Sequence, residues 1–276
     1  MNDEQVTAWN GPSGHAWVES QPLLDRILEP MAELLLRAVP EGSARRILDV
    51  GCGAGATTLA FARRVGAEGS CLGIDISQPM IDAARARAER EGVPARFVIA
   101  DAQTHAFEPA SFDLIVSRFG VMFFDDPVSA FTNLRRAAKN DAELRFVAWR
   151  SPADNPFMTT AERAAAPLLP NLPARRPDGP GQFAFGDAAR VRNILEQAGW
   201  AAIDIQPVDL VCSFPEKDLV RYLTRMGPLG RVLDDADDAT RTRIISSIRA
   251  AFDPFVHGDE VRFTSASWQV VAHAPR

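Results

Sequence analysis

The sequence of 276 residues is poor in cysteine, and its three cysteines, Cys52, Cys71 and Cys212, are far apart. It contains neither a Cys-x-x-Cys pair nor a Cys/His cluster with the spacing of metal ligands. The first residues lack a basic stretch followed by an apolar one, and no apolar run approaches the roughly 18 residues that a membrane helix needs. We therefore expect a reduced, cytoplasmic protein with no metal site.

Lysine is also scarce, since only Lys139 and Lys217 are found among 30 basic residues, and 36 acidic residues bring the formal net charge to −6. A negative net charge disfavours long-range attraction to nucleic acid or to an anionic membrane. The hydrophobic content of 46% is ample for a packed interior. We expect a globular protein whose partner is a small molecule; the oligomeric state stays open.

From Arg46 onward, short apolar runs alternate with amphipathic stretches, which is typical of a parallel sheet with crossover helices. The predicted strands are 46–50, 71–75, 95–100, 112–119, 143–149, 201–214 and 263–274. The predicted helices are 22–39, 56–66, 80–92, 125–140, 158–168, 187–199, 216–226 and 237–252. Prolines and glycines around the helix at 158–168 indicate a loop-like insertion.

The strongest local signal is ILDVGCGAGATTLAFA at 47–62, in which a buried strand leads through Gly51, Gly53 and Gly55 into a helix. Such glycines let the chain turn sharply and let a ligand lie against the backbone and the helix N-terminus. Asp75 ends the next strand, where a carboxylate can accept both hydroxyls of a ribose. The alternatives are a plain turn with glycines for packing and an acidic cap for the next helix.

The glycine spacing is GxGxG, whereas a dinucleotide site typically has GxGxxG. Together, LDVGCGAG, GIDIS and ADAQTHAFEPASFDLIVSRFGVMFF (100–124) resemble the class I S-adenosylmethionine-dependent methyltransferases, in particular the small-molecule branch of ubiquinone and menaquinone biosynthesis. The resemblance covers roughly residues 45–150. It implies an α/β, Rossmann-like fold, whose seven-stranded, mostly parallel sheet has one antiparallel strand and helices on both faces.

The resemblance also assigns the contacts of the cofactor S-adenosyl-L-methionine. Its methionine part would meet Asp49, Gly51, Gly53 and the backbone carbonyl of Ser117. Its nucleoside part would meet Asp75, Ile76, Met80, Asp101 and Ala102. The alternatives are that Asp101 is only a turn residue and that Ser117 is only the end of a strand.

Residues 1–45 precede the expected methyltransferase domain at 46–276 and contain WNGPSGHAW (9–17). The Asn-Gly-Pro-Ser-Gly run at 10–14 consists of turn formers, so we expect it not to be the interior of a helix or strand. The resemblance suggests that this segment covers the cofactor, with Trp9, Asn10 and Trp17 as the candidate residues. The alternative is that both indoles only pin the N-terminal extension to the core.

An acceptor pocket is expected between this lid, the loop after the fourth strand and insertions at about 150–186 and 215–257. Its predicted wall is RFGVMFF (118–124), Trp149, Phe157, Met158, Phe183, Phe185, Tyr222 and Met226. An apolar, aromatic wall suits a flat or hydrophobic molecule. The helical spacing of Tyr222 and Met226 is equally compatible with core positions.

The catalytic group stays unidentified, because no Ser-His-Asp or paired-carboxylate arrangement has suitable spacing. His15 and His257 are weak candidates for a general base, and Arg118 could steer an anionic oxygen or pair with a surface carboxylate. We predict a methyltransferase that acts on an O, N or C atom of a small, hydrophobic or aromatic metabolite. A non-catalytic regulator that binds S-adenosylmethionine and an NAD-dependent oxidoreductase are the alternatives.

Overall fold

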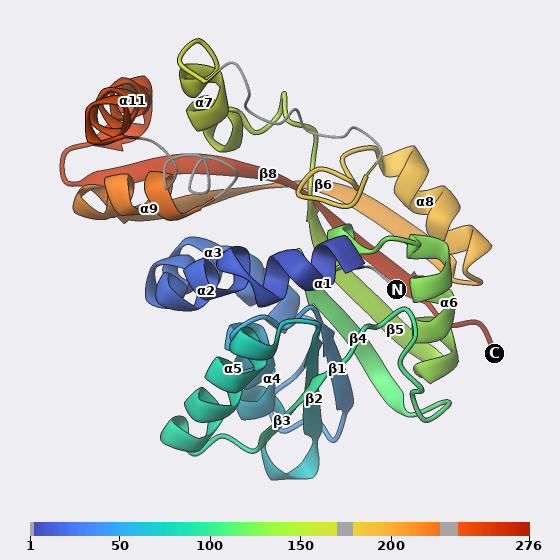
Figure 1. Ribbon diagram of the computed structural model, residues 1–276. Helices are drawn as coiled ribbons and strands as arrows, with labels where there is room; N and C mark the ends of the chain where they lie inside the picture. The colour runs from blue at the N-terminus through green and yellow to red at the C-terminus, as the bar shows by residue number, and fades with distance from the viewer. Residues whose placement is uncertain (1–2, 170–178, 227–236) are drawn as a thin grey trace.

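The computed structural model describes residues 3–169, 179–226 and 237–276. Its sheet has the strand order β3-β2-β1-β4-β5-β8-β6 (Figure 1), and β1 to β5 are parallel whereas β8 is antiparallel to both of its neighbours. The strands are β1 (Arg46–Val50), β2 (Ser70–Asp75), β3 (Ala95–Ile99), β4 (Phe112–Arg118), β5 (Ala138–Trp149), β6 (Ala201–Pro215), β7 (Val256–His257) and β8 (Glu260–His273). The expected seven-stranded, mostly parallel sheet is confirmed, and the two-residue β7, which only pairs with β8, is an addition that the sequence did not predict.

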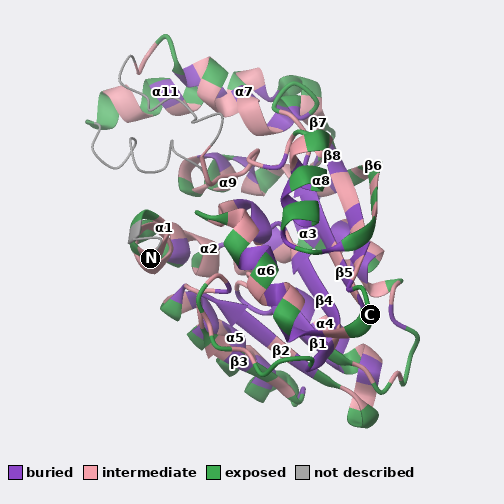
Figure 2. Ribbon diagram, turned by 90° about the vertical axis from the view of Figure 1, so that its right-hand side faces the viewer, coloured by how far each residue is buried: buried purple, intermediate pink, exposed green. Residues whose placement is uncertain are grey.

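Helices cover both faces of this sheet, as expected. α3 and α4 contact each other on one side, and α6 and α8 contact each other on the opposite side (Figure 1). The helices are α1 (Asp3–Asn10), α2 (Pro12–Glu19), α3 (Gln21–Leu36), α4 (Ala56–Val65), α5 (Gln78–Glu91), α6 (Pro127–Ala137), α7 (Pro156–Ala165), α8 (Ala188–Gln197), α9 (Leu219–Arg225) and α11 (Asp238–Ala251). The burial pattern follows this layering, because the central strands β1, β2 and β4 are mostly buried, whereas the edge strand β6 and the outer helix faces are largely exposed (Figure 2).

Helix starts follow local chemistry. The Ser77 hydroxyl accepts a hydrogen bond from the backbone N–H of Met80 and caps α5, and Asp126 caps α6 in the same way through Ser129. The predicted helix at 125–140 is too long, because Ala138 already pairs with Phe112 as the first residue of β5. Tertiary strand pairing therefore overrides the helical pattern there.

The prediction that the run at 10–14 is not the interior of a helix holds at the turn of Gly11 but is wrong for Pro12 to Gly14, which belong to α2. Asn10 ends α1, and Pro12 is the first residue of α2, a position where a missing backbone N–H costs nothing. Gly14 lies buried inside α2, and a Cβ there would meet the Trp9 carbonyl oxygen at 2.0 Å. The turn formers thus build a tight corner between two short helices.

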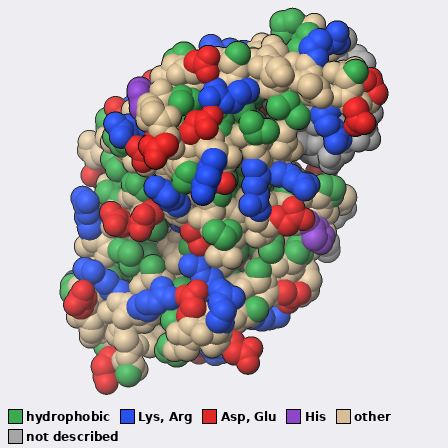
Figure 3. Space-filling view, turned by 90° about the vertical axis from the view of Figure 1, so that its left-hand side faces the viewer, with side chains coloured by type: hydrophobic (Ala, Val, Ile, Leu, Met, Phe, Trp, Pro, Cys, Tyr) green, Lys and Arg blue, Asp and Glu red, His purple; other side chains and the backbone are tan. Residues whose placement is uncertain are grey.

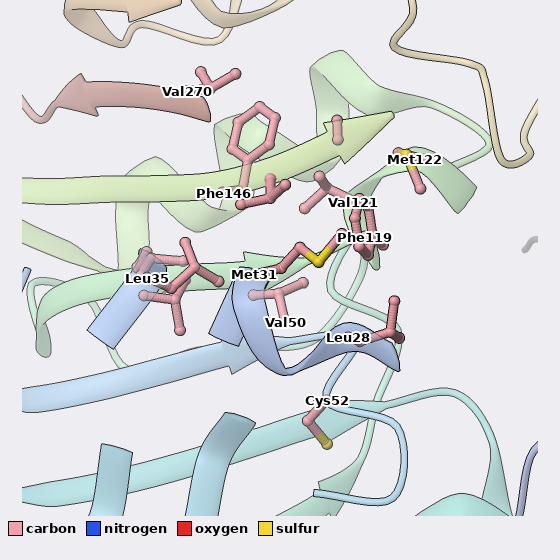
Figure 4. Close-up of a cluster of buried hydrophobic side chains, with 14 of the residues drawn as sticks. Leu28, Met31, Leu35, Val50, Cys52, Phe119, Val121, Met122, Phe146 and Val270 are labelled. Atoms are coloured by element: carbon pink, nitrogen blue, oxygen red, sulfur yellow. The ribbon is translucent and has the colours of Figure 1, made fainter. Parts of the chain in front are cut away.

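The helix α3 fixes the N-terminal extension to the sheet, close to the expected 22–39. Leu28, Met31 and Leu35 are buried and belong to one apolar cluster with Val50 and Phe119 (Figure 4). This i, i+3, i+7 spacing gives one apolar stripe, and its burial is the main source of stability for an amphipathic helix.

The expected insertions contribute a separate group of helices, in which α11 contacts both α7 and α9. Aromatic rings fill the space below them, since Phe157 stacks on Phe263 at 3.8 Å and makes edge contacts with Phe252 and Phe255. Residues 170–178 of the first insertion and 227–236 of the second are outside the described residues. No described helix has the length and apolarity needed to cross a membrane.

Candidate functional site

A cavity of about 710 Å³ opens at the carboxyl ends of β1, β2 and β4, the edge where parallel sheets bind ligands. We call the part lined by Gly51, Gly53, Asp75, Ile76, Met80, Asp101 and Ala102 the polar end. We call the part lined by Phe119, Trp149, Phe157, Met158, Ala161, Tyr222, Leu223 and Phe252 the apolar end. Outside the cavity, basic and acidic side chains are interspersed on the face shown in Figure 3.

The glycine turn of the polar end has a conformation that few other residues adopt. Gly51, Gly53 and Gly55 have φ of 68°, 54° and 84°. A Cβ on Gly51 would lie 2.6 Å from the Cα of Gly120, so the first glycine is also needed for the close approach of two backbones. The expected sharp turn is therefore present, and Gly51 and Gly53 line the cavity.

Asp75 is held rigidly at the end of β2. Its Oδ2 accepts a hydrogen bond from the backbone N–H of Gly53 and its Oδ1 accepts one from Ser77, both at 2.9 Å. Burial raises the pKa of Asp75, while these backbone hydrogen bonds favour the charged form. Because a carboxylate oxygen has two lone pairs, each oxygen can still accept a hydroxyl from the cavity.

Two other carboxylates, those of Asp49 and Asp101, each have an oxygen without a hydrogen-bond partner among the described residues. Asp49 lies behind the cavity lining, where Thr58 donates to its Oδ2 at 2.6 Å, and its Oδ1 is unpartnered. Asp101 lines the cavity and accepts from the Gln103 N–H through Oδ1, and its Oδ2 is unpartnered. Burial raises the pKa of Asp49 to about 6. Unpaired buried acceptors favour a ligand that donates hydrogen bonds.

Ser117 does not line the cavity. It is fully buried in β4, where its hydroxyl donates to the Val50 carbonyl at 2.7 Å and accepts from the backbone N–H of Gly120 and Val121. It therefore fixes the turn that brings Arg118, Phe119 and Gly120 to the cavity. Its assigned contact with a ligand through the backbone carbonyl has no support from this geometry.

The N-terminal helices close over the polar end. Asn10 donates to the Ile76 carbonyl at 3.0 Å and accepts from the Gln78 N–H at 2.8 Å, and the Ser77 hydroxyl donates to the Trp9 carbonyl. The ring of Trp9 makes edge contacts with Trp17 and Phe123 at centroid distances of 5.9 and 5.2 Å. Trp9 and Trp17 both line the cavity, and Trp9 also joins the extension to Phe123, so this position is compatible with a lid and with a structural anchor.

Arg118 lies half-buried in the cavity wall, and within the described part of the chain its side chain makes one hydrogen bond, to the Leu28 carbonyl at 3.4 Å. Within the described ranges, no carboxylate lies at ion-pair distance from it, so the expected alternative of a surface ion pair is not realised there. Burial lowers its pKa, which the nearby charges of Asp25 and Asp49 oppose. The guanidinium stays charged at neutral pH and can receive an anionic group.

The histidine candidates are less well placed. His15 is exposed at the edge of the cavity, and its Nδ1 lies 2.9 Å from the Gly11 carbonyl oxygen. His257 is exposed in β7 and is not part of the lining. Neither is held against the reacting part of the cavity.

The apolar end is built around a stacked pair, since Phe119 and Trp149 lie 4.4 Å apart with an interplanar angle of 5°. Phe119 has φ of 66°, which is unusual for a bulky residue and stores local strain of about 1–3 kcal/mol. Of the predicted wall, Val121, Phe183 and Phe185 do not line the cavity. Phe185 instead packs in the core against Phe131 and Phe146.

The glycine turn and the strands around it match a known family. Residues 47–141 match the family model of the methyltransferase domain. Residues 47–141 are a methyltransferase domain. This family agrees with the resemblance drawn from the motifs and contradicts a dinucleotide-dependent oxidoreductase.

The curated relatives include methyltransferases that are named for small molecules. The aklanonic acid methyltransferase DauC of Streptomyces sp. (strain C5) is 32% identical over 136 residues, which are 48% of this chain and 62% of that protein. The ubiquinone/menaquinone biosynthesis C-methyltransferase UbiE of Idiomarina loihiensis is 25% identical over 171 residues, 58% of this chain and 68% of its own. The match to DauC and the next two relatives spans only 41 to 62% of their lengths.

Solved structures confirm the fold. The YcgJ protein of Bacillus subtilis has a TM-score of 0.58 at 20% identity, over 89% of this chain and 98% of its own. A phosphoethanolamine N-methyltransferase of Haemonchus contortus in complex with S-adenosyl-L-methionine has a TM-score of 0.54 at 17% identity, over 88% of this chain and 52% of its own.

The methyltransferase domain implies S-adenosylmethionine as cofactor, and the residues present fit it. The unpartnered oxygens of Asp101, in the cavity lining, and of Asp49, behind it, could accept hydrogen bonds from the amino groups at the two ends of such a molecule. Each carboxylate oxygen of Asp75 accepts one backbone N–H and has a second lone pair, so Asp75 could accept hydrogen bonds from two hydroxyls.

The sequence did not predict all of the residues that line the cavity. Leu24, Ile27 and Leu28 of α3 line it, although their helical spacing predicted only core positions. The apolar period of 22–39 was visible in the sequence, but it did not reveal that one end of this stripe faces a ligand site. Glu162 and Gln182 also line the cavity.

Proposed function

We propose that the protein transfers the methyl group of S-adenosylmethionine to an O, N or C atom of a small, flat and apolar metabolite. One observation carries the proposal: the glycine turn, Asp75 and Asp101 converge on one end of a cavity whose other end is aromatic and apolar. A cofactor and an acceptor can thus share one enclosed space. The methyltransferase family and the names of the relatives support the same reaction type.

The polar end would hold the cofactor by its two ends. Asp49 would accept from the methionine ammonium, either directly or through water, next to the backbone of Gly51 and Gly53. Asp75 would accept both ribose hydroxyls. Asp101 would accept from the adenine amine while Ala102 offers its backbone N–H, and the adenine ring would lie between Ile76 and Met80. When bound, S-adenosylmethionine supplies an electrophilic methyl group on a sulfonium sulfur.

The helices α1 and α2 would act as a lid. With Trp9 and Trp17 closed over the polar end, they would exclude water and restrain the reactants. Holding two groups in line is worth up to roughly 7–11 kcal/mol of the barrier in favourable systems. Positioning by this chain can therefore account for much of the catalysis without a general base.

Arg118 would position an anionic oxygen of the acceptor. Its charge has no carboxylate partner among the described residues, and it lies beside Phe119 at the start of the apolar end. An acceptor that is already ionised is a competent nucleophile and needs no general base. The reaction therefore does not require His15, which is exposed. The name of the relative DauC also specifies an acid as its substrate.

We place this reaction in the cytoplasm, and the net charge of −6 disfavours nucleic acid as the acceptor. Calorimetry tests the cofactor: S-adenosylmethionine should bind and NAD should not. Release of S-adenosylhomocysteine in the presence of a library of apolar acids and phenols separates an enzyme from a regulator. Preferential binding of NAD would overturn the proposal, and binding without turnover on any acceptor would favour the regulator.

A further inference from the structure

Tyr222 is the chain's single tyrosine, against 16 phenylalanines. It lies on α9 and lines the apolar end of the cavity. Its ring packs against those of Phe157 and Phe214, at centroid distances of 5.8 and 5.5 Å and interplanar angles of 39° and 38°. Because two rings hold it, the position of its hydroxyl is fixed.

The hydroxyl has a poor hydrogen-bond partner. Among the described residues it bonds only the Met158 Sδ, at 3.7 Å. A thioether sulfur is a weak acceptor, and a buried hydroxyl with a weak partner favours any stronger acceptor that reaches it. The neighbouring polar side chain on α9, Thr224, is different, because its hydroxyl donates to the Val220 carbonyl at 2.9 Å.

The hydroxyl is also restricted to the role of a neutral donor. Burial raises the pKa of Tyr222 above its ordinary value. Among the described lining residues, Arg118 is a cation without a carboxylate partner, whereas Arg225 at the rim approaches Glu19 at 3.9 Å. Tyr222 is thus a neutral donor within walls formed by Phe157, Met158 and Leu223.

We propose that the Tyr222 hydroxyl donates a hydrogen bond to a carbonyl oxygen of the methyl acceptor and thereby selects aromatic ketones over hydrocarbons of the same shape. This inference rests on the proposed function, because it places the acceptor in the apolar end. Tyr222 acts on binding and orientation, since the phenolic oxygen contacts the acceptor without a proton leaving it.

A matched pair of flat probes tests the proposal. Fluorenone and fluorene have the same ring system and differ in one carbonyl oxygen. Both are titrated into the protein saturated with S-adenosylhomocysteine, and tryptophan fluorescence reports binding because Trp149 lines the same space. The wild-type protein should prefer fluorenone by about tenfold or more, since sites built to hydrogen-bond an oxygen reject analogues that lack it.

Two variants separate the hydroxyl from the ring. Tyr222→Phe should abolish the preference by weakening fluorenone alone. Met158→Leu removes the competing sulfur and should keep the preference or increase it. A preference that persists in Tyr222→Phe, or a wild-type protein that binds neither probe or both equally, would overturn the proposal.

Two further measurements distinguish the loss of this hydrogen bond from damage to the fold or to the cofactor site. Affinity for S-adenosylhomocysteine should be the same in the wild type and in Tyr222→Phe, and a wild-type protein without that affinity would refute the proposed function. The melting temperature should also stay unchanged, because the hydroxyl loses only a weak partner. A clear fall in melting temperature together with an unchanged preference would assign the hydroxyl a structural role and overturn the inference.

Discussion

The polar end of the cavity is fixed by backbone groups, whereas the apolar end is fixed by the packing of side chains. At the polar end, N–H groups of Gly53 and Ser77 hold Asp75, and the glycine turn itself forms the wall. At the apolar end, rings from β5, α7, α9 and the segment after α11 meet only because those elements pack together. A backbone site tolerates few residue types, whereas a packed aromatic wall tolerates many.

The family match divides the cavity in a similar way. The methyltransferase domain at 47–141 contains Asp49, Gly51, Asp75 and Asp101, together with Phe119 at the start of the apolar end. The rest of the apolar end, from Trp149 to Phe252, lies beyond the matched residues. The family match therefore covers the glycine turn and the acidic residues of the proposed cofactor site but little of the proposed acceptor site.

The largest expected effect is that of Gly51→Ala. The new Cβ would lie 2.6 Å from the backbone of Gly120, so the turn must open. Stability should fall by about 2–4 kcal/mol and calorimetry should detect no binding of S-adenosylmethionine. Gly92→Ala is the matched control, because Gly92 has a similar φ of 62° but open space around it. This control should cost about 1 kcal/mol and leave binding intact.

Asp75→Ala should weaken the binding of S-adenosylmethionine by about 1–3 kcal/mol, because both ribose hydroxyls and the Gly53 N–H lose their acceptor. Asp82→Ala, on the exposed face of α5, is the control and should change nothing. Equal affinities of the two variants would remove Asp75 from the site.

The affinity for S-adenosylmethionine should depend on pH because Asp49 titrates. Its pKa is raised to about 6, so the neutral form dominates below that pH and cannot accept from an ammonium as a carboxylate does. Calorimetry should show affinity falling up to about tenfold per pH unit below 6. Burial raises the pKa of Asp75 in the same direction. Asp49→Asn should flatten this dependence, and a dependence that persists would exclude Asp49 as its cause.

The raised pKa of Asp49 also predicts how the stability of the ligand-free protein changes with pH. A buried acid with a raised pKa stabilises the fold only while it is protonated, so the Asp49 contribution is lost as the pH rises from about 4 to about 6. Denaturant unfolding of the wild type and of Asp49→Asn at pH 4 and pH 7 measures it. The wild type should lose more stability than the variant over this interval.

Trp9→Ala should raise the dissociation constant of S-adenosylmethionine by about 3–10-fold, because the lid loses its edge contacts with Trp17 and Phe123. Trp9→Phe retains an aromatic ring and should recover most of the affinity. A stable Trp9→Ala protein with unaltered binding and kinetics would reject the lid.

The smallest expected effect on the cofactor is that of Ala161→Phe, which adds a ring to the wall of the apolar end. It should exclude the acceptor and abolish turnover while leaving affinity for S-adenosylmethionine unchanged. Loss of cofactor affinity in this variant would show that the two ends are not independent.

Much of the fold could be predicted because it is encoded locally. The strand at 46–50 and the cap at Ser77 agree with the structure, since an apolar run and a hydroxyl before a proline act over a few residues. The predictions of a helix at 125–140 and of an irregular run at 10–14 are partly wrong because contacts with distant segments decide the structure there. The pairing of Ala138 with Phe112 and the hydrogen bonds that join Trp9 to Ser77 and Asn10 to Gln78 connect segments that are far apart in the sequence.

The sequence by itself determined the glycine turn, the acidic residues at the strand ends and the family, because these depend on residue type at fixed short spacing. Only the tertiary structure decided that Ser117 is buried behind the wall, that Phe185 belongs to the core and that Arg118 has no carboxylate partner among the described residues. Those outcomes depend on which distant segments meet, and the energy of a contact is not contained in either segment alone.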